Sequence, residues 1–146
     1  MSNQNQHNRE WGYEVPIPTV TPSGQQVTVQ RSERGGRHLM HAETEDQSEF
    51  YFEVCAYDRV LAHGPLAEEQ RRFISEHALS RHPGECTPAT FGHLQGTTFA
   101  FEGELQGKLK KRVFLFVDGP NRTYRLVHDP RSSLNPAALA AFHFLD

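Results

Sequence analysis

The sequence predicts an α+β fold with a mainly antiparallel β-sheet. Several stretches alternate apolar and polar residues as strands do, and their apolar positions are rich in aromatic and β-branched side chains. Residues 66–82 have the periodicity of an amphipathic helix instead. Strands are therefore expected before and after one long helix, with a short helix near the C-terminus, and this order favours antiparallel pairing.

The N-terminal part is predicted to be a polar tail and extended arm over residues 1–24, followed by a single α+β domain over 25–146. We expect the first ten residues to be mobile because they are polar. The arm contains alternating apolar residues, namely Trp11, Tyr13, Val15 and Ile17. Prolines interrupt this alternation and cannot donate to a sheet ladder, so the arm is expected to be an edge strand or an extended surface segment.

The domain divides into strands and two helices. Strands are predicted at 27–29, 38–43, 50–57, 89–94, 98–105, 109–117 and 123–128. Glycine–proline pairs flank the helix predicted at 66–82, whose apolar side includes Phe73 and His77. Asn135 followed by Pro136 is typical of a helix start, so a short C-terminal helix is expected there.

A basic run, Lys108–Arg112, immediately precedes an apolar stretch. With a three-residue hairpin loop, Glu104 would lie opposite Lys110. Glu102 would likewise lie opposite Arg112, so opposite charges would pair across the strands. A two-residue loop matches the side chains less well. We therefore expect a solvated strand end neutralised by its acidic neighbour, with a phosphate-binding patch as the alternative.

The composition predicts no general affinity for anionic partners. The formal net charge is -3, from 15 basic and 18 acidic side chains, which favours binding neither to nucleic acid nor to a membrane. Cys55 and Cys86 are too few for a disulfide framework, and the histidines lack metal-site spacing, so we expect reduced thiols and no metal or cofactor. The N-terminus lacks an apolar signal sequence, which favours the cytoplasm.

Residue patterns typical of catalysis are weak. His82 and Cys86 could form a base and a nucleophile, but nearness in sequence is poor evidence for such a pair. Glu102 and Glu104 share a strand face, as paired catalytic carboxylates would, yet their basic neighbours favour ion pairing. We expect no enzymatic activity.

The C-terminal half resembles the PsbP-like fold family, including its bacterial DcrB-type branch. The positions that carry the resemblance are Gly96, Tyr124, Leu126, His128, Phe142 and Phe144. The helix predicted at 66–82 stands where that family has its central helix, and the resemblance covers roughly residues 25–146. It implies a single αβα sandwich around a central antiparallel sheet. It also implies a non-enzymatic protein that binds partners, since members of the family are chiefly of that kind.

Two binding functions follow as hypotheses. The first is a non-enzymatic protein-binding module of the cytoplasm, an adaptor or chaperone, whose arm would cover a groove or sheet edge of an unidentified protein partner. An ordinary edge strand packed on its own domain is the alternative for the arm. The second is a small-molecule binder with a cavity between helix and sheet. The residues expected to line that cavity are Tyr51, Tyr57, Phe73 and His77. A monomer or homodimer is expected in either case.

Overall fold

The computed structural model describes residues 4–45, 47, 49–77, 83–105, 107–132 and 134–145. Its elements in chain order are β1 (Gln6–Asn8), β2 (Tyr13–Val15), β3 (Thr28–Arg34), β4 (Arg37–Glu43), β5 (Tyr51–Tyr57), α1 (His63–His77), β6 (Thr87–Phe91), β7 (Leu94–Leu105), β8 (Lys108–Asp118), β9 (Thr123–His128), α2 (Leu134–Ala141) and β10 (His143–Phe144). The named strands pair antiparallel, which confirms the predicted α+β class with a mainly antiparallel sheet.

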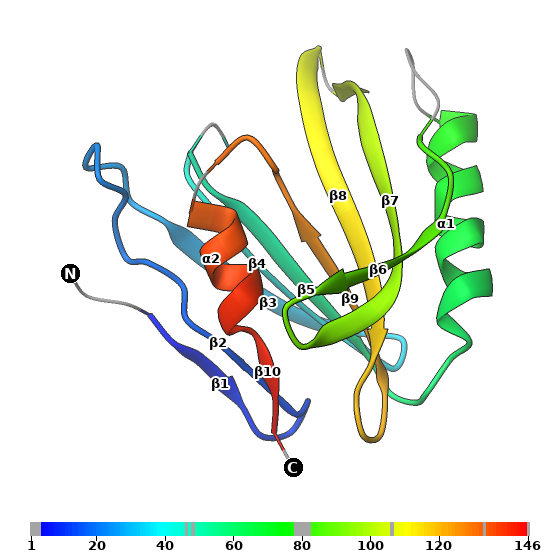
Figure 1. Ribbon diagram of the computed structural model, residues 1–146. Helices are drawn as coiled ribbons and strands as arrows, with labels where there is room; N and C mark the ends of the chain where they lie inside the picture. The colour runs from blue at the N-terminus through cyan, green and yellow to red at the C-terminus, as the bar shows by residue number, and fades with distance from the viewer. Residues whose placement is uncertain are drawn as a thin grey trace.

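The strands form a large sheet and a small sheet. The large sheet has seven strands in the order β3-β4-β5-β9-β8-β7-β6, and the small sheet has three in the order β1-β2-β10. Strands β3 to β5 and β6 to β9 each form a meander of sequential neighbours, and the pairing of β9 with β5 joins the two halves. The long β7–β8 hairpin extends well beyond its neighbours at one end (Figure 1).

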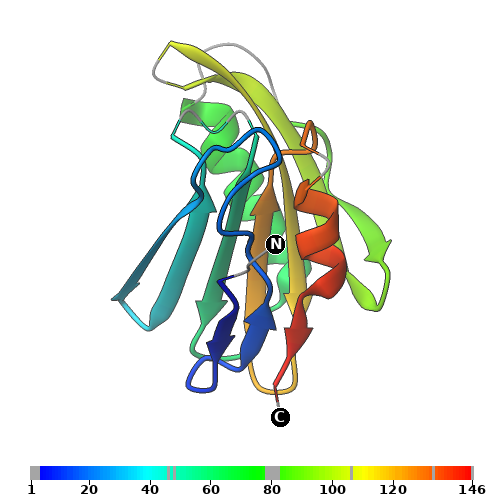
Figure 2. The same cartoon turned by 90° about the vertical axis from the view of Figure 1, so that its left-hand side faces the viewer.

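The large sheet lies between two unequal layers. Helix α1 packs on one face, over β7 and β8, and we call this the α1 face. The small sheet and α2 cover the opposite face, which we call the α2 face. Figure 2 shows the small sheet and α2 in front of the large sheet with α1 behind it. The two helices therefore lie on opposite faces of the large sheet.

The main core lies between the α2 face and the layer that covers it. Strands β4, β5, β8 and β9 contribute alternate residues, and the arm contributes Tyr13, Val15 and Ile17, whose exposed fractions are 0–1%. These three side chains belong to the protein's own core. The expected edge strand was wrong, because β2 is the middle strand of the small sheet and pairs with both β1 and β10. The polar tail predicted to be mobile contains strand β1 and the buried Gln6, because β1 pairs with β2.

An aromatic cluster joins the C-terminal segment to the arm and to β9. The Phe142 ring stacks on Tyr13 and meets Tyr124 edge-on, with both centroid distances at 5.8 Å. Phe144 lies 5.1 Å from Tyr124, between ring centroids. The Tyr124 hydroxyl donates to the carbonyl oxygen of Gly12 (3.1 Å), and a Cβ at that glycine would lie 2.9 Å from the same hydroxyl. Tyr124, Phe142 and Phe144, which carry the family resemblance, thus pack together.

Helix α1 differs in detail from the predicted helix at 66–82. It begins at His63 and extends to His77, and residues 78–82 lie outside the part of the chain that the structure describes. Ala67 is buried against the aromatic rings of β7 and β8. Phe73 is 61% exposed, and His77, predicted to be a core histidine, is exposed and stacks on Phe73. Helical periodicity therefore predicted Phe73 and His77 to face the core, whereas both are exposed.

Two predicted strand details were wrong. The β7–β8 hairpin has a two-residue connection, with Leu105 opposite Lys108 and Phe101 opposite Arg112. Gly107 has a φ of 78°, a value suited to such a tight turn. The strand predicted at 89–94 is instead the end of β6, a turn, and the first residue of β7.

Truncating Ile17 should destabilise the whole domain, because the side chain is completely buried in the main core. We expect Ile17→Ala to lower the free energy of unfolding by about 2–5 kcal/mol, measured by urea denaturation. Arg9→Ala, at an exposed position before the arm, should change it by less than about 0.5 kcal/mol. Similar small effects of both substitutions would show that the arm does not belong to the core.

Acidification should destabilise the protein through His128. Burial lowers the pKa of His128, and it likewise lowers the pKa of His38, from the usual value of 6.5. The unfolded chain therefore binds protons near pH 6.5 while the folded chain does not, so stability falls as pH drops below about 6.5. His128→Leu should reduce this slope in urea midpoints recorded between about pH 7 and 5. His93→Leu, at an exposed turn, should keep the wild-type slope.

Candidate functional site

A cleft of about 570 Å³ lies between α1 and the strands that extend beyond it on the α1 face. The helix packs over β7 and β8, so the opposite half of this face is open to solvent beside the helix. The residues that line the cleft are Ser32, Glu33, Arg34, Arg37, Leu39, Cys55, Gln70, Phe73 and Arg125. Its size is within the range of ordinary small-molecule sites.

The register of the strands determines which side chains form the floor of the cleft. Leu39 lies opposite Ser32 on one side and opposite Cys55 on the other. Cys55 in turn lies opposite Arg125. Because directly opposite residues of antiparallel strands project to the same face, these side chains form one row beneath the cleft. Helix α1 supplies the wall through Gln70 and Phe73.

Arg125 connects the floor to the wall. Its Nη2 donates to Glu53 (2.5 Å) and its Nη1 donates to the Gln70 side chain of α1 (3.0 Å). Burial opposes the charge of Arg125, but the nearby Glu53 carboxylate outweighs it and leaves the arginine pKa raised. Arg125 Nε is buried and makes no hydrogen bond within the part of the chain that the structure describes. This leaves one donor of a charged group unused beside the cleft.

Cys55 and Tyr57 share this face and are nearly inaccessible. Burial raises the pKa of the Cys55 thiol, with Arg125 acting in the opposite direction. Burial also raises the pKa of Tyr57, so both groups are neutral at pH 7. The chemistry of the floor is therefore that of polar recognition, since a protonated, buried thiol is a poor nucleophile.

Two exposed arginines lie at the rim of the cleft. Arg34 and Arg37 are direct cross-strand partners on either side of the β3–β4 turn, so their side chains project to the same face. Neither forms an ion pair with any residue of the described ranges. The sequence analysis did not select them, although Gly35-Gly36 between two strands is a signal for a two-residue hairpin.

The residues predicted to line a cavity are partly brought together. Phe73 lines the cleft, and Tyr57 lies on the same face as the direct neighbour of Arg37. Tyr51 lies farther along β5, where its hydroxyl donates to Glu53 (2.8 Å). His77 stacks on Phe73 at the exposed end of α1 and is not among the lining residues. Of the predicted partner-binding residues, only Trp11 is half-exposed.

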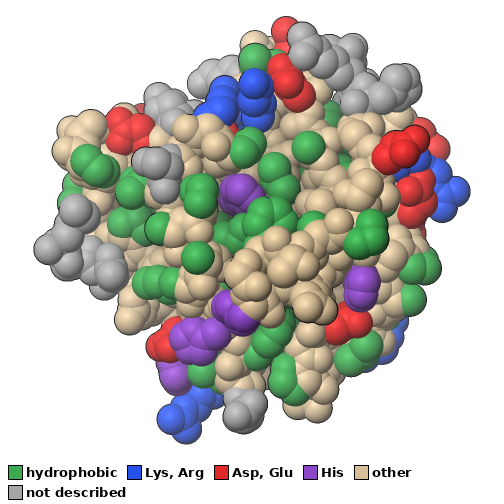
Figure 3. Space-filling model, viewed as in Figure 1, with side chains coloured by type: hydrophobic (Ala, Val, Ile, Leu, Met, Phe, Trp, Pro, Cys, Tyr) green, Lys and Arg blue, Asp and Glu red, His purple; other side chains and the backbone are tan. Residues whose placement is uncertain are grey.

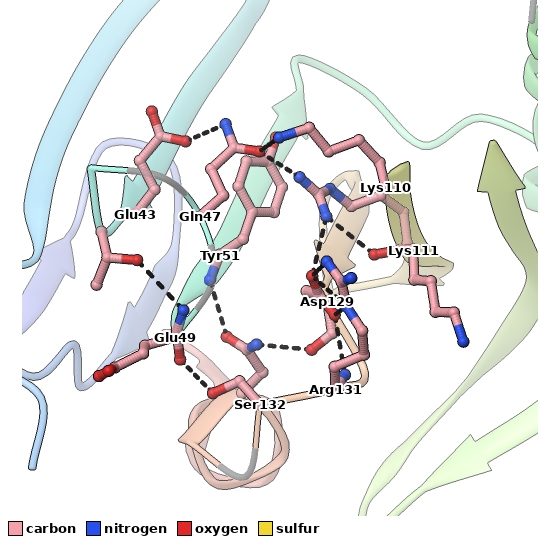
Figure 4. A network of polar contacts seen from close by, with 12 residues as sticks. Glu43, Gln47, Glu49, Tyr51, Lys110, Lys111, Asp129, Arg131 and Ser132 are labelled. Carbon is pink, nitrogen blue, oxygen red and sulfur yellow. Dashed lines mark hydrogen bonds and ion pairs between the residues drawn. The ribbon is translucent and has the colours of Figure 1, made fainter. Parts of the chain in front are cut away.

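Three basic side chains of the run, those of Lys110, Lys111 and Arg112, make polar contacts at the far end of the large sheet. Figure 4 shows Lys110 reaching the side-chain oxygen of Gln47, to which it donates at 2.8 Å. Arg112 donates to the same oxygen at 2.5 Å. Arg112 also forms an ion pair with Asp129 (3.3 Å), which directly follows β9. The sequence analysis expected Glu102 to be the partner of Arg112. Glu102 is instead 3.9 Å from Lys111. This network ties the strand to the loops that contain Gln47 and Asp129. Arg112 is buried, so this part of the run is neutralised by its neighbours but is not the solvated strand end that was expected.

Histidines gather over the small sheet (Figure 3). Glu14 lies between His7 and His143, at 2.9 Å and 3.0 Å from their ring nitrogens. Hydrogen bonding and charge from His7, with His143, lower the pKa of Glu14. Across the described ranges, no group of three His, Cys, Asp or Glu side chains could hold a metal ion. The three residues therefore act as a link between neighbouring strands.

The proposed nucleophile pair is incomplete in the described structure. Burial raises the pKa of the Cys86 thiol, and a hydrogen bond and charge from Glu68 raise it further. His82 lies outside the described residues. Within the described ranges, neither helix is long and apolar enough to cross a membrane.

Comparison with known proteins gives a likeness at the level of the fold. No family model matches the chain, and no curated protein matches it. A crystal structure from Bacteroides thetaiotaomicron VPI-5482 is similar, with a TM-score of 0.59 and 12% sequence identity. The match covers 100% of this chain and 50% of that one, so this chain spans about half the length of its neighbour. At such identity the likeness shows a shared fold alone.

Removing Asp129 should leave Arg112 buried without its carboxylate. Burial alone would raise the pKa of Asp129, but hydrogen bonds and charge from Arg131, with Arg112, keep it below the usual value. We expect Asp129→Ala to lower the free energy of unfolding by about 3–5 kcal/mol in urea denaturation. Lys111→Ala, which breaks a solvent-exposed pair, should cost less than about 1 kcal/mol. Equal costs would contradict the structural role of the buried pair.

Proposed function

We propose that this protein binds a small molecule in the cleft between α1 and the large sheet. The observation that carries the proposal is the cleft itself, which combines an apolar part with convergent polar groups. Leu39 and Phe73 supply apolar surface, while Arg34 and Arg37 supply donors at the rim. Such a combination is typical of sites that bury the body of a ligand and orient its polar end.

The burial of the arm weakens the competing hypothesis of partner binding through that segment. Tyr13, Val15 and Ile17 pack inside the protein, so they offer no accessible surface to another chain. The cleft, in contrast, is accessible, and Phe73 leaves most of its ring exposed beside it. Accessible apolar surface next to unused donors is what a ligand can employ.

A bulky side chain on the floor of the cleft should prevent ligand retention. We expect native mass spectra of the wild-type chain, purified from its own host, to contain a bound small molecule that is missing from Leu39→Trp. Leu109→Trp places the same ring at an exposed position at the start of β8 and should retain the ligand. Equal retention by both variants, or no bound species in the wild type, would overturn the proposal.

A protein-binding role as adaptor or chaperone is a second candidate. Strand β3 favours it, because β3 forms an edge of the large sheet and most of its side chains are exposed. An exposed strand edge can pair with an extended segment of another chain or with a second copy of this one. Co-purification of a stoichiometric protein, together with an empty cleft, would favour this candidate over a small molecule.

The PsbP-like, DcrB-type assignment and the cytoplasmic location are also proposals. The central antiparallel sheet with helices on opposite faces and the packing of Phe142 and Phe144 around Tyr124 support the former. Cys55 and Cys86 are free thiols, as is usual in a reducing compartment.

A further inference from the structure

We infer that the ligand of the cleft is an organic anion whose charged group binds between Arg34 and Arg37 and whose apolar body lies on Leu39 and Phe73. This inference rests on the proposed function and adds the chemical class of the ligand to it. It depends on the charge at the rim, on the absence, within the described ranges, of an ion pair to either rim arginine, and on the position of the apolar surface.

The charge at the rim is unfavourable for the sheet in the absence of an anion. Arg34 and Arg37 are directly opposite one another, and like charges at directly opposite positions destabilise an antiparallel pair. A hairpin that needed only to be stable would place opposite charges here. Arginine is also the side chain best suited to carboxylate and phosphate groups, because its planar guanidinium can donate two parallel hydrogen bonds.

The acidic residues near the cleft make contacts with groups other than Arg34 and Arg37. The Asp58 carboxylate lies beside Gly36 at the β3–β4 turn and pairs with Arg59 (3.0 Å). Glu33 is the carboxylate among the lining residues, and it accepts a hydrogen bond from Trp11 Nε1 (2.6 Å). Glu53 accepts from Arg125 (2.5 Å) and from Tyr51 (2.8 Å). The positive charges of Arg34 and Arg37 therefore remain available to a ligand.

The apolar surface lies next to these charges, which sets the shape of the ligand. Leu39 follows Arg37 on β4 at the next position of the same strand face, and Phe73 closes the cleft from α1. An anion with an apolar body can bury that body on Leu39 and Phe73 while its charged group stays at the wet rim. A small inorganic anion would leave this apolar surface exposed.

Two dyes that share one ring system separate the charge from the apolar body. The sulfonate dye 8-anilinonaphthalene-1-sulfonate is an apolar anion, and N-phenyl-1-naphthylamine is the same ring system without the charge. In fluorescence titrations of the wild type, we expect the sulfonate dye to bind more tightly than the neutral dye. The double variant Arg34→Gln/Arg37→Gln should weaken the binding of the sulfonate dye by about tenfold or more and leave the neutral dye unchanged. Arg9→Gln, an exposed charge outside the cleft, should change neither affinity.

Ionic strength provides a second measurement on the wild-type protein. Raising the salt from about 0.01 M to 0.15 M shortens the Debye length from about 30 Å to 8 Å, so the affinity for the sulfonate dye should fall while that for the neutral dye does not. The thermal midpoint of the double variant should equal or exceed that of the wild type, because a like-charge pair has been removed.

The outcomes distinguish the inference from the function on which it rests. Unchanged sulfonate affinity in the double variant, or an equal loss for both dyes, would overturn the anion inference. If Leu39→Trp still abolishes binding of the neutral dye, the cleft remains a small-molecule site. If Leu39→Trp affects neither dye, the proposed function fails along with the inference.

Discussion

Burial of the arm against the α2 face is the interaction on which the rest of the structure depends. Tyr13, Val15 and Ile17 fill the space over β4, β5 and β9, and Phe142 joins them from the end of α2. Each large side chain that is fully buried contributes about 1.5–3 kcal/mol. Without this layer the apolar face of the large sheet would be exposed to water, so the segment before residue 25 is part of the domain.

Because most of the apolar burial occurs on the α2 face, the α1 face can carry polar groups. Its own apolar cluster is smaller and lies under the helix, around Ala67, Phe99 and Phe116. Beyond the helix the same face holds the Glu53–Arg125 pair and half-exposed side chains. The α2 face thus contributes most of the stability, and the α1 face presents an open surface beside helix α1.

The sequence was informative where periodicity is local. It predicted β4, β5, β9 and the position of α1, since alternation and helical spacing are properties of short segments. Sequence-based prediction failed where the structure of a segment depends on residues distant in the chain. Strands β1 and β10 exist through their pairing with β2. The β7–β8 register suits Arg112 because Asp129, which directly follows β9, supplies its carboxylate. Phe73 was selected for the cavity, but the rim arginines become neighbours only through the β3–β4 turn.

The like-charge pair at that turn is best understood as a compromise between stability and binding. Where the described structure buries arginines most deeply it supplies carboxylates, as Glu53 for Arg125 and Asp129 for Arg112. Arg34 and Arg37 instead lie opposite each other at the edge of the cleft, where the cost of repulsion is small because both are exposed to solvent. Local sequence choices that disagree with stability tend to mark functional positions. An anion held between the two guanidinium groups would turn the repulsion into attraction, so ligand binding would also stabilise the hairpin that forms its site.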